Sequence, residues 1–403
     1  MALLLLASCG SPTVIPLRPE APPDVVPIDA PESSQADWTV DCNGGADFET
    51  ISDAIDAASD GEWIEVAPCT YREVVDFSGK SLWISSSDGP ETTIIDARGD
   101  YGVIAQRGEG DGSALVGFTI DGAGGTYGAV YAYLAALRLE DVTISSARGG
   151  YFVIYAASAD MELQDVDIVD STASYYTIDM SRGAFTADGL SVSCSGNSYA
   201  LVAGHGSFFL DHSTLSCGSG YAIYNENSTG RVQRSSLRGA LYAATDEDHY
   251  TDTNLFENTV IRGSISQTYG TLVLRNSILD GGTITGTDLY ELRLQANVFQ
   301  SARCAFGNTW SGEDTAVDPT STVEYNDFWD MTAEGCDGTV YVGTDGNIAE
   351  DPSFTDEASG DYSVPASSPL VDAGLEDDIY DDPDGSRNDI GVYGGPHSVG
   401  GGW

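Results

Sequence analysis

Three residues in this sequence have types that suit proton transfer: Asp211 and His212 are adjacent, and Arg234 follows 22 residues later. An arginine can neutralise the carboxylate of a substrate while a histidine accepts a proton from it. This hypothesis requires that residues about one repeat apart lie side by side. The alternative is a solvated ladder of side chains joined by ion pairs between successive coils. The two interpretations depend on the elements that position these residues.

Tyrosines and arginines form a second set of candidates. Seven tyrosines recur at a similar spacing, and an aromatic ring in such a series either stacks on a sugar or packs against its neighbours. Arg238 and Arg262 occupy equivalent places in successive repeats, inside a stretch from Arg231 to Arg303 that holds seven of the fifteen arginines. Together these residues are candidate ligand-binding positions, with Tyr151, Tyr175, Tyr199 and Tyr221 as the central rings.

An acidic segment near the end of the chain suggests a metal site. Asp382, Asp384 and Asp389 surround a glycine turn, and calcium prefers several oxygen ligands from one tight loop. The spacing is not a full EF-hand, because Tyr393 stands where that loop has glutamate. A hydrogen-bonded acidic turn is the alternative. We expect no organic cofactor.

A repeat organises these residues. From about residue 115, pairs of apolar or small residues five positions apart recur, beginning with Leu115/Ile120, Leu139/Ile144 and Leu163/Ile168 and ending with Val323/Phe328. The second members advance by 18 to 29 residues, and most steps are 22 to 24. A period near 20–25 is typical of a solenoid. The consensus of leucine-rich repeats is missing, and short, glycine-punctuated segments favour an all-β coil.

Other residue columns keep this register. The position three before the second apolar residue is mostly polar, and the next is serine, threonine or asparagine in the later repeats. The first column holds Asp141, Asp165, Gly189, His212, Arg234, Asn258 and Asn276, and the second holds Ser213, Ser235, Thr259, Ser277, Asn297 and Asn326. Since stacked coils lie about 4.8 Å apart, equivalent side chains should form ladders.

Seven cysteines are present, an odd number that leaves one for a separate role. Cys194 and Cys217 fall at the same place in consecutive repeats, which suits a disulfide. Cys304 and Cys336 belong to the last two repeats and could pair. Cys42 and Cys69 flank a short amphipathic helix predicted around residues 47–58, and a disulfide between them would hold it in place. No cysteine pair has the spacing of a zinc site.

Cys9 is the seventh cysteine. The segment Leu6-Ala7-Ser8-Cys9 resembles a bacterial lipobox, which predicts a signal peptide over residues 1–9 and lipid attachment at Cys9. The segment lacks a basic n-region, and a chance apolar N-terminus is the alternative. Seven prolines over residues 10–37 predict an extended tether. We therefore expect an exported lipoprotein of the outer membrane or cell surface.

The formal net charge of −47 argues against nucleic acid as a partner, because both would be strongly negative. An apolar fraction of 41% is sufficient for a continuous core. We expect a monomer with a cap and first coils over residues 38–112, coils over 113–335 and a C-terminal cap over 336–403. A membrane, through the lipid anchor, and a polysaccharide are the expected partners.

Segments at both ends of the chain carry a family resemblance. They are Phe48–Ile51, Ala54–Ala58, Ala67–Glu73 and Ser78–Leu82 at the start, and Asp351–Phe354, Ser368–Gly374 and Asp382–Gly391 at the end. With these segments the sequence resembles, over residues 42–396, the pectin-lyase-like family of bacterial right-handed parallel β-helix proteins. Cys69 replaces a glycine that is common in this family.

The resemblance implies a single-stranded right-handed β-helix with a helical N-terminal cap, but it implies no single activity. The catalytic strings of pectin methylesterases and polygalacturonases are missing apart from Gly204-His205-Gly206, which is more typical of a turn. We therefore predict a non-enzymatic surface protein that binds glycan or another surface, or serves as a spacer. A polysaccharide lyase or glycoside hydrolase is the alternative.

Overall fold

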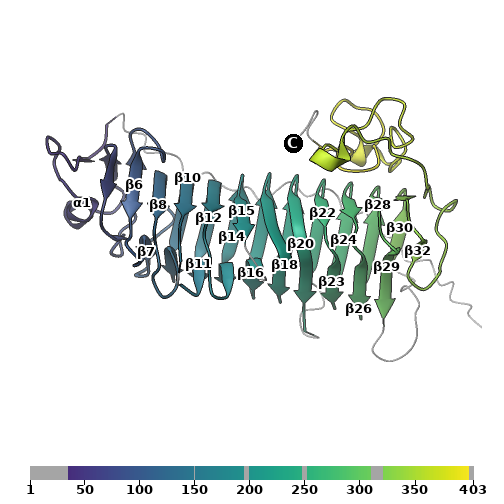
Figure 1. Cartoon of the computed structure of the whole chain (residues 1–403), viewed down its shortest axis with the longest axis horizontal. Coiled ribbons are helices and arrows are strands. Elements are labelled where there is room, and N and C mark those ends of the chain that lie inside the picture. The colour runs from purple at the N-terminus through teal and green to yellow at the C-terminus, as the bar shows by residue number, and fades with distance from the viewer. Residues whose placement is uncertain (1–34, 149, 195–198, 247–251, 310–320, 399–403) are drawn as a thin grey trace, which may run out of the picture.

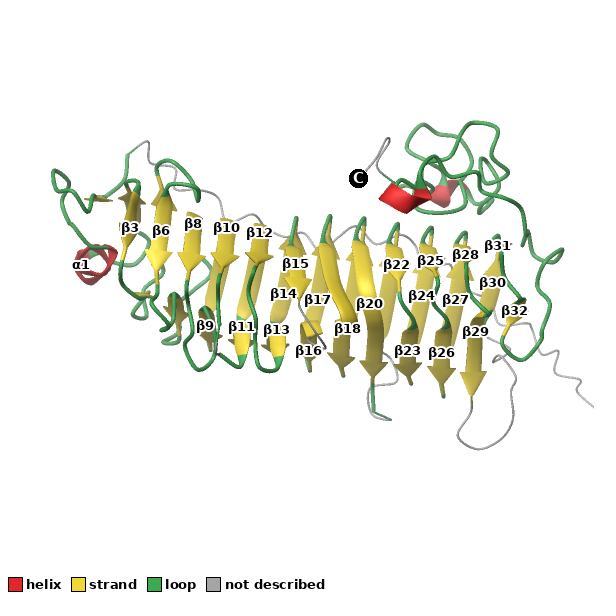
Figure 2. Cartoon of the chain, in the orientation of Figure 1, coloured by secondary structure: helices red, strands yellow, loops and turns green. Residues whose placement is uncertain are grey.

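The chain forms one elongated parallel β-helix in the computed structural model (Figure 1 and Figure 2). The structure describes residues 35–148, 150–194, 199–246, 252–309 and 321–398. Every pairing between its named strands is parallel, so successive strands belong to successive coils. The predicted all-β solenoid is confirmed. Residues 1–34, including Cys9 and most of the proline-rich segment, lie outside the described residues.

Each coil contributes strands to three faces, which we name A, B and C in chain order. Face A contains β1 (Trp38–Val40), β2 (Trp63–Val66), β5 (Trp83–Ser86), the first parts of β8 (Ala114–Asp121), β10 (Ala136–Ser145) and β12 (Asp160–Val169), then β14 (Ala184–Asp188), β17 (Ser207–Asp211), β19 (Thr229–Gln233), β21 (Thr253–Glu257), β24 (Thr271–Arg275), β27 (Glu291–Gln295) and β30 (Thr322–Glu324).

Face B follows after a sharp corner. It contains β3 (Cys69–Tyr71), β6 (Thr93–Asp96), the second parts of β8, β10 and β12, β15 (Ser191–Cys194), the first parts of β18 (Thr214–Glu226) and β20 (Ser236–Ala244), then β22 (Val260–Arg262), β25 (Ile278–Asp280), β28 (Val298–Gln300) and β31 (Asp327–Trp329).

Face C completes the coil. It contains β4 (Val75–Asp76), β7 (Val103–Ala105), β9 (Val130–Tyr133), β11 (Phe152–Ala157), β13 (Tyr176–Ser181), β16 (Tyr199–Gly204), the last parts of β18 and β20, β23 (Ile265–Thr268), β26 (Ile284–Thr287), β29 (Cys304–Thr309) and β32 (Ala333–Gly335).

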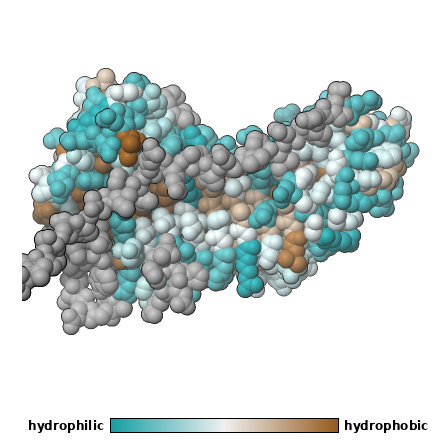
Figure 3. Space-filling model, turned by 180° about the vertical axis from the view of Figure 1, so that it is seen from behind, coloured by the Kyte–Doolittle hydropathy of each residue, from teal (hydrophilic) through white to brown (hydrophobic). Residues whose placement is uncertain are grey.

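The predicted apolar pairs are the core of the coils. The first member of each pair lies on face A and the second on face B, and both columns pair in register, as Leu139 with Leu163 and Ile144 with Ile168. These side chains are almost completely buried. On the side of the molecule seen in Figure 3, most residues are hydrophilic or neutral, and hydrophobic residues form only small separate patches.

The corner between faces A and B depends on one residue per coil with a positive φ. This residue is three positions before the second apolar residue, in the column that contains His212 (φ 42°) and Arg234 (φ 45°). The complete series is Gly117, Asp141, Asp165, Gly189, His212, Arg234, Asn258, Asn276, Ala296 and Tyr325. The left-handed conformation tolerates glycine, asparagine and aspartate best, which explains the usual composition of this column.

The next position supplies a buried hydrogen-bonded ladder. The backbone N–H of Ser213 donates to the Ser235 hydroxyl at 3.0 Å, and that of Asn297 donates to the Asn326 side-chain oxygen, also at 3.0 Å. The ladder continues to Asn347, whose oxygen accepts from the Asn326 backbone N–H at 2.9 Å. The predicted ladder of serine, threonine and asparagine is therefore confirmed, and it satisfies N–H groups that the corner takes out of the sheet.

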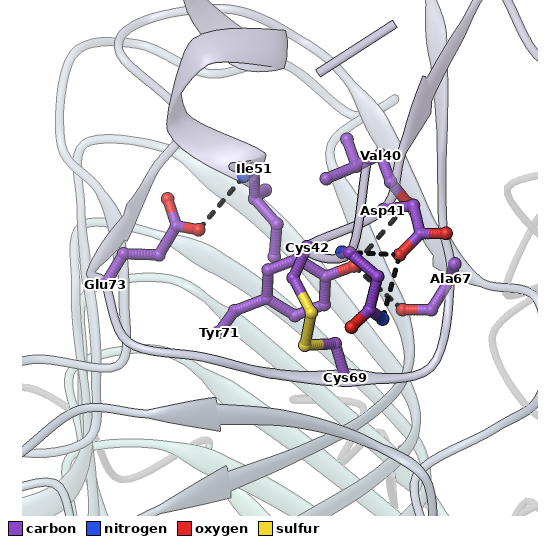
Figure 4. The surroundings of a disulfide bond; sticks show 9 residues. Val40, Asp41, Cys42, Ile51, Ala67, Cys69, Tyr71 and Glu73 are labelled. Atoms are coloured by element: carbon purple, nitrogen blue, oxygen red, sulfur yellow. Dashed lines mark hydrogen bonds between the residues drawn. A yellow bond between two sulfur atoms is a disulfide. The ribbon is translucent and has the colours of Figure 1, made fainter. Parts of the chain in front are cut away.

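The first coil is covered by α1 (Ile51–Ala57). The predicted apolar stripe of this helix is buried, and Thr50 caps its N-terminus by accepting from the Asp53 N–H. Figure 4 shows Glu73 reaching the helix and the Tyr71 ring beneath it, beside the disulfide between Cys42 and Cys69. None of the helices in the described ranges has the length and apolarity that a bilayer crossing requires.

All three predicted disulfides form. Cys194 and Cys217 are register partners on face B, with Cα atoms 4.9 Å apart. Cys304 on β29 pairs with Cys336, just after β32, at a Cα separation of 5.1 Å. With the disulfide between Cys42 and Cys69, these bridges cross-link neighbouring segments at the start, the middle and the end of the stack of coils.

The C-terminal segment, residues 351–398, folds back along the side of the coils instead of closing their end (Figure 1). It carries two short 3-10 helices, η1 (Glu357–Ser359) and η2 (Asp378–Tyr380). Its apolar residues Tyr362, Leu370, Ile390 and Val392 pack on the outward side chains of Val260, Ile278 and Val298. The open end of the last coil is covered by Met331, Tyr341 and Val342.

Polar contacts fix the same segment at the corner of faces A and B. The Asn258 side-chain amide donates to the carbonyls of Val392 and Gly394 at 2.9 and 2.6 Å. The Asn276 amide donates to the Asp389 carbonyl at 2.8 Å. These side chains belong to the column of positive-φ residues, so the corner both turns the chain and holds the C-terminal segment.

We expect Ile278→Ala to loosen this segment, because Ile278 is fully buried only through its contact with residues 351–398. Truncation of a buried isoleucine costs about 2–5 kcal/mol. Hydrogen exchange at the Ile390 amide, which donates to the Leu370 carbonyl, would report the loss. Thr143→Ala, at the equivalent outward position of an uncovered coil, is the control; equal protection in both variants would contradict the packing role.

We expect Asp327 to make the stability of the protein depend on pH. It is fully buried, and desolvation raises the pKa of its carboxyl to about 7. One hydrogen bond, from the Glu350 N–H, acts in the opposite direction and favours the charged form. Because the folded state then holds the proton more tightly than the unfolded state, the free energy of unfolding should fall as pH rises from about 4 to about 7. Asp327→Asn should remove that fall and be more stable than the wild type at pH 8, by about 2–4 kcal/mol.

Urea denaturation at pH 4.5 and pH 8 would measure this difference. Asp330→Asn is the matched control, since Asp330 is exposed three residues away and its left-handed conformation accepts asparagine. A wild-type protein whose stability does not fall between these two pH values would contradict the prediction.

Candidate ligand-binding strip and the corner cluster

A continuous ladder of aromatic rings runs along the outside of face C. Neighbouring rings of this ladder lie 4.9–5.9 Å apart, within the range of favourable ring contacts. The ladder spans the coils from β9 to β20 and joins, in spatial order, Tyr131, Tyr155, Phe152, Tyr176, Tyr199, Tyr224 and Tyr242.

A second row of tyrosines lies beside this ladder, at the turns that lead into face C. Tyr127, Tyr151 and Tyr175 are 39%, 42% and 57% exposed, respectively. The Tyr151 and Tyr175 rings are 5.2 Å apart, and Tyr127 contacts Tyr155 of the ladder, also at 5.2 Å. We call the ladder and this row together the tyrosine strip. Monomeric proteins seldom expose so many neighbouring aromatic rings without a partner.

The prediction of one tyrosine column was wrong in its register. Tyr199 and Tyr221 are register partners of Tyr176, whereas Tyr151 and Tyr175 precede their strands. Tyr242 pairs with Tyr224 in another column, and Tyr269 follows β23 at the far end of face C. The predicted rings from Tyr151 to Tyr221 nevertheless lie on the same face, since each contacts a neighbour in the strip.

The strip is acidic as well as aromatic. Asp179 lies on β13, between buried Ile178 and Met180, and therefore points outward. Burial raises the pKa of its carboxyl to about 6. Glu226 accepts a hydrogen bond from the Tyr224 hydroxyl at 3.0 Å. Burial also raises the pKa of Tyr131, Tyr155 and Tyr176, so these phenols are neutral donors at ordinary pH.

The structure brings Asp211, His212 and Arg234 together at the corner of faces A and B. The Arg234 guanidinium binds both carboxylate oxygens of Asp211, with a distance of 2.7 Å from Nε to Oδ1. The His212 Nδ1 atom lies 3.4 Å from Asp211 and 3.0 Å from Asp188. Burial alone would raise the pKa of Asp211, but hydrogen bonds from Arg234 and Gln233 hold it below its usual value.

This geometry is a poor arrangement for proton transfer on a substrate. Arg234 is already neutralised by Asp211, so it has little charge to offer an incoming carboxylate. His212 and Arg234 also occupy the positive-φ column, which gives both residues a structural reason for their positions. The ion-pair alternative explains the cluster better, although the pair is largely buried rather than solvated, with side-chain exposures of 22% for Arg234 and 6% for Asp211.

Asp188, Asp211 and His212 are also the one group of three potential metal ligands that the described ranges bring within 4.8 Å. A cation bound there would compete with the Arg234 guanidinium for both oxygens of Asp211. The same corner continues as buried ion pairs: Arg275 lies 2.8 Å from Glu257 and beneath the Tyr380 ring. The arginines and carboxylates of this corner therefore neutralise one another.

Arg238 and Arg262 are register partners on face B, as predicted. Arg262 lies 3.6 Å from Asp280, and its guanidinium is 5.3 Å from the centre of the Tyr362 ring in the C-terminal segment. It therefore helps to hold that segment. Arg238 is exposed and remains a candidate for a bound anion.

The acidic turn of the C-terminal segment uses its carboxylates internally. Asp382 accepts from the backbone N–H groups of Asp389 and Gly395, at 3.2 and 2.5 Å. Asp384 accepts from Ser386, and Asp389 accepts from the Asp372 N–H. This arrangement fits the hydrogen-bonded turn, while calcium binding stays a prediction.

A cleft of about 500 Å³ lies between the corner and the C-terminal segment, and the sequence did not suggest it. Its walls come from β27, β30 and the residues around η2, and include Arg293, Glu324, Tyr325, Glu376 and Tyr380. Glu291 holds Arg293 through two contacts of 2.6 and 3.0 Å. No sequence pattern could reveal this cleft, because its two walls are more than 40 residues apart.

No family model and no curated protein sequence matches the chain. Three similar solved structures are pectin methylesterase from carrot, pectate lyase Pel9A and PfbA, a surface adhesin of Streptococcus pneumoniae. Their identities are 15%, 12% and 10%, with TM-scores of 0.26, 0.32 and 0.29. The alignments cover 81%, 85% and 74% of this chain and 91%, 90% and 91% of the others, respectively. The assignment of the β-helix rests on the strand pairing, and these scores add nothing to it.

We expect Asp211→Asn to destabilise the corner and His212→Asn to leave it almost unchanged. Loss of the Asp211 charge leaves Arg234 without its ion-pair partner, at a cost of about 2 kcal/mol or more. Asparagine at position 212 accepts the left-handed conformation, as Asn258 and Asn276 do in other coils. Midpoints of urea denaturation would test this order; a greater loss in His212→Asn than in Asp211→Asn would contradict it.

Proposed function

We propose that this protein is an exported, non-enzymatic surface protein that binds a polysaccharide along the tyrosine strip. The observation that carries the proposal is the exposure of Tyr127, Tyr151 and Tyr175 beside a ladder of seven rings. Aromatic rings offer apolar faces and phenol donors at little entropic cost. A strip that repeats with the coils suits a ligand that also repeats, which favours a linear polymer over a small molecule.

The fold supports this proposal by its rigidity. The rings of the ladder belong to β-strands paired in register, so little conformational entropy would be lost there on binding. The strip also lies on a different face from the C-terminal segment, which packs on face B. The ligand would therefore reach the rings without displacing any described part of the chain.

A polysaccharide lyase or hydrolase is the second candidate. Its catalytic residues would be Asp211, His212 and Arg234, which belong to the corner of faces A and B and not to the strip on face C. The pairing of Arg234 with Asp211 argues against this alternative. We therefore rank binding without cleavage first.

Export and lipid attachment at Cys9 are part of the proposal. The three disulfides are consistent with an extracellular protein, because such bridges persist in oxidising compartments. With six cysteines paired, Cys9 is the one cysteine left for a lipid. A proline-rich tether between this residue and the first coil would hold the strip away from the membrane.

A glycan array probed with the purified chain tests the proposal directly. We expect retention of intact glycans and weaker binding by the double variant Tyr151→Ala/Tyr175→Ala. Each exposed ring should contribute about 1 kcal/mol, so the double variant should lose roughly tenfold or more in affinity. Tyr290→Ala is the control, because Tyr290 is 60% exposed and lies outside the strip. Release of cleaved sugar would favour the enzyme, and an unchanged affinity in the double variant would exclude the strip.

A further inference from the structure

One outward column of the tyrosine strip is interrupted, and a carboxylate stands at the first interrupted position. In the column of Tyr131 and Tyr155, the next two coils carry Asp179 and Val202 before the column resumes with Tyr224 and Tyr242. The ring ladder bypasses this interruption through Phe152, Tyr176 and Tyr199. Asp179 thus lies where a ring is missing, with aromatic side chains on the coils to either side.

No described hydrogen bond or ion pair offsets the burial of the Asp179 carboxylate. It is half-buried, and no described residue is a hydrogen-bond donor to it. Burial raises the pKa of its carboxyl to about 6, without an opposing contribution from a nearby cation. The carboxylates of the corner behave differently, because Arg234 and Arg275 neutralise Asp211 and Glu257. A desolvated charge without a partner is costly, and such costs concentrate at functional sites.

We infer that Asp179 is the polar anchor of the tyrosine strip and selects sugars that present hydrogen-bond donors without negative charge. This inference rests on the proposed function and names its ligand class: a glycan of neutral or amino-substituted sugars, and not a polyuronate. A carboxylate accepts hydrogen bonds from hydroxyl or ammonium groups, while the neighbouring rings contact the apolar faces of the sugars. Ammonium groups gain further from the electron-rich ring faces.

Charge explains why a polyuronate is excluded. A uronate carboxylate placed against Asp179 would bring two like charges together in a partly desolvated site, where repulsion is several times stronger than in water. The phenols near Asp179 are neutral, since burial raises the pKa of Tyr155 and Tyr176. The formal charge of −47 adds repulsion at long range for any polyanion.

Calorimetric titration of the full chain at pH 7.5 with three six-sugar probes tests this inference. The probes are cellohexaose, which is neutral, the β-1,4-glucosamine hexamer, which has amino groups, and hexagalacturonate, which is anionic. We expect one or both of the first two to bind and hexagalacturonate to bind at least tenfold more weakly. Preference between the first two identifies whether hydroxyl or amino groups are the hydrogen-bond donors to Asp179.

The variant Asp179→Asn separates binding from folding. It should lower the affinity for the preferred probe about tenfold or more. It should also reduce the difference in affinity between that probe and hexagalacturonate, because the charge is lost and the shape of the side chain is kept. Its melting temperature should stay equal or rise, since a desolvated charge has been removed. Asp167→Asn is the control, because Asp167 is an exposed, outward carboxylate of face B and lies outside the strip.

The outcomes distinguish the inference from the proposed function. If Tyr151→Ala/Tyr175→Ala weakens a probe and Asp179→Asn does not, the strip binds glycan and the role of Asp179 is excluded. Tighter binding of hexagalacturonate than of the other two probes would also overturn the inference while leaving glycan binding intact. Binding of no probe here and no glycan on the array would overturn both.

Discussion

One backbone conformation, repeated at the corner of faces A and B, supports the rest of this molecule. Each coil must turn sharply there without losing its inward side chains, and a single residue with positive φ accomplishes this. The side chain of the following serine, threonine or asparagine then accepts a hydrogen bond from a backbone N–H group of the preceding coil. Because both features recur with each coil, the apolar columns on either side of the corner stay aligned and the core is continuous.

The sequence predicted this part of the fold well because the corner has a fixed length. Ile144 lies five positions after Leu139, and the same spacing holds in the coils that follow, so register could be counted along the chain. The disulfide between Cys194 and Cys217 and the contact between Asp211 and Arg234 followed from that register. The function of the cluster could not be predicted in the same way. The left-handed corner position that brings His212 and Arg234 together also gives both residues a structural role, so their proximity alone does not indicate catalysis.

The predicted register of the tyrosines was wrong because the chain between faces B and C has no fixed length. The passage from face B to face C varies in length between coils, and the pairing of β18 with β20 contains register shifts there. Tyr221 and Tyr242 follow their apolar residues by different intervals, so a constant offset could not assign them to columns. The placement of residues 351–398 was equally hidden, since a terminal segment has no repeat that fixes its position.

Outward positions are the most informative about function. The stacking of coils requires no particular side chain there, so an unusual outward residue needs another explanation. Most outward residues of face B are polar, as Thr143 and Ser236 are, but three successive coils carry Val260, Ile278 and Val298. Their apolar character is explained by the C-terminal segment that covers them.

The outward tyrosines of face C are an equal departure from the polar pattern, yet none of the described chain covers Tyr127, Tyr151 or Tyr175. Contiguous exposed apolar surface is a common mark of an interaction site. The apolar column of face B has its partner within the chain, and the same reasoning supports our proposal that the rings of face C bind a ligand from outside it. In that proposal, Asp179 lies in the outward column of Tyr131 and Tyr155 and would accept hydrogen bonds from the ligand.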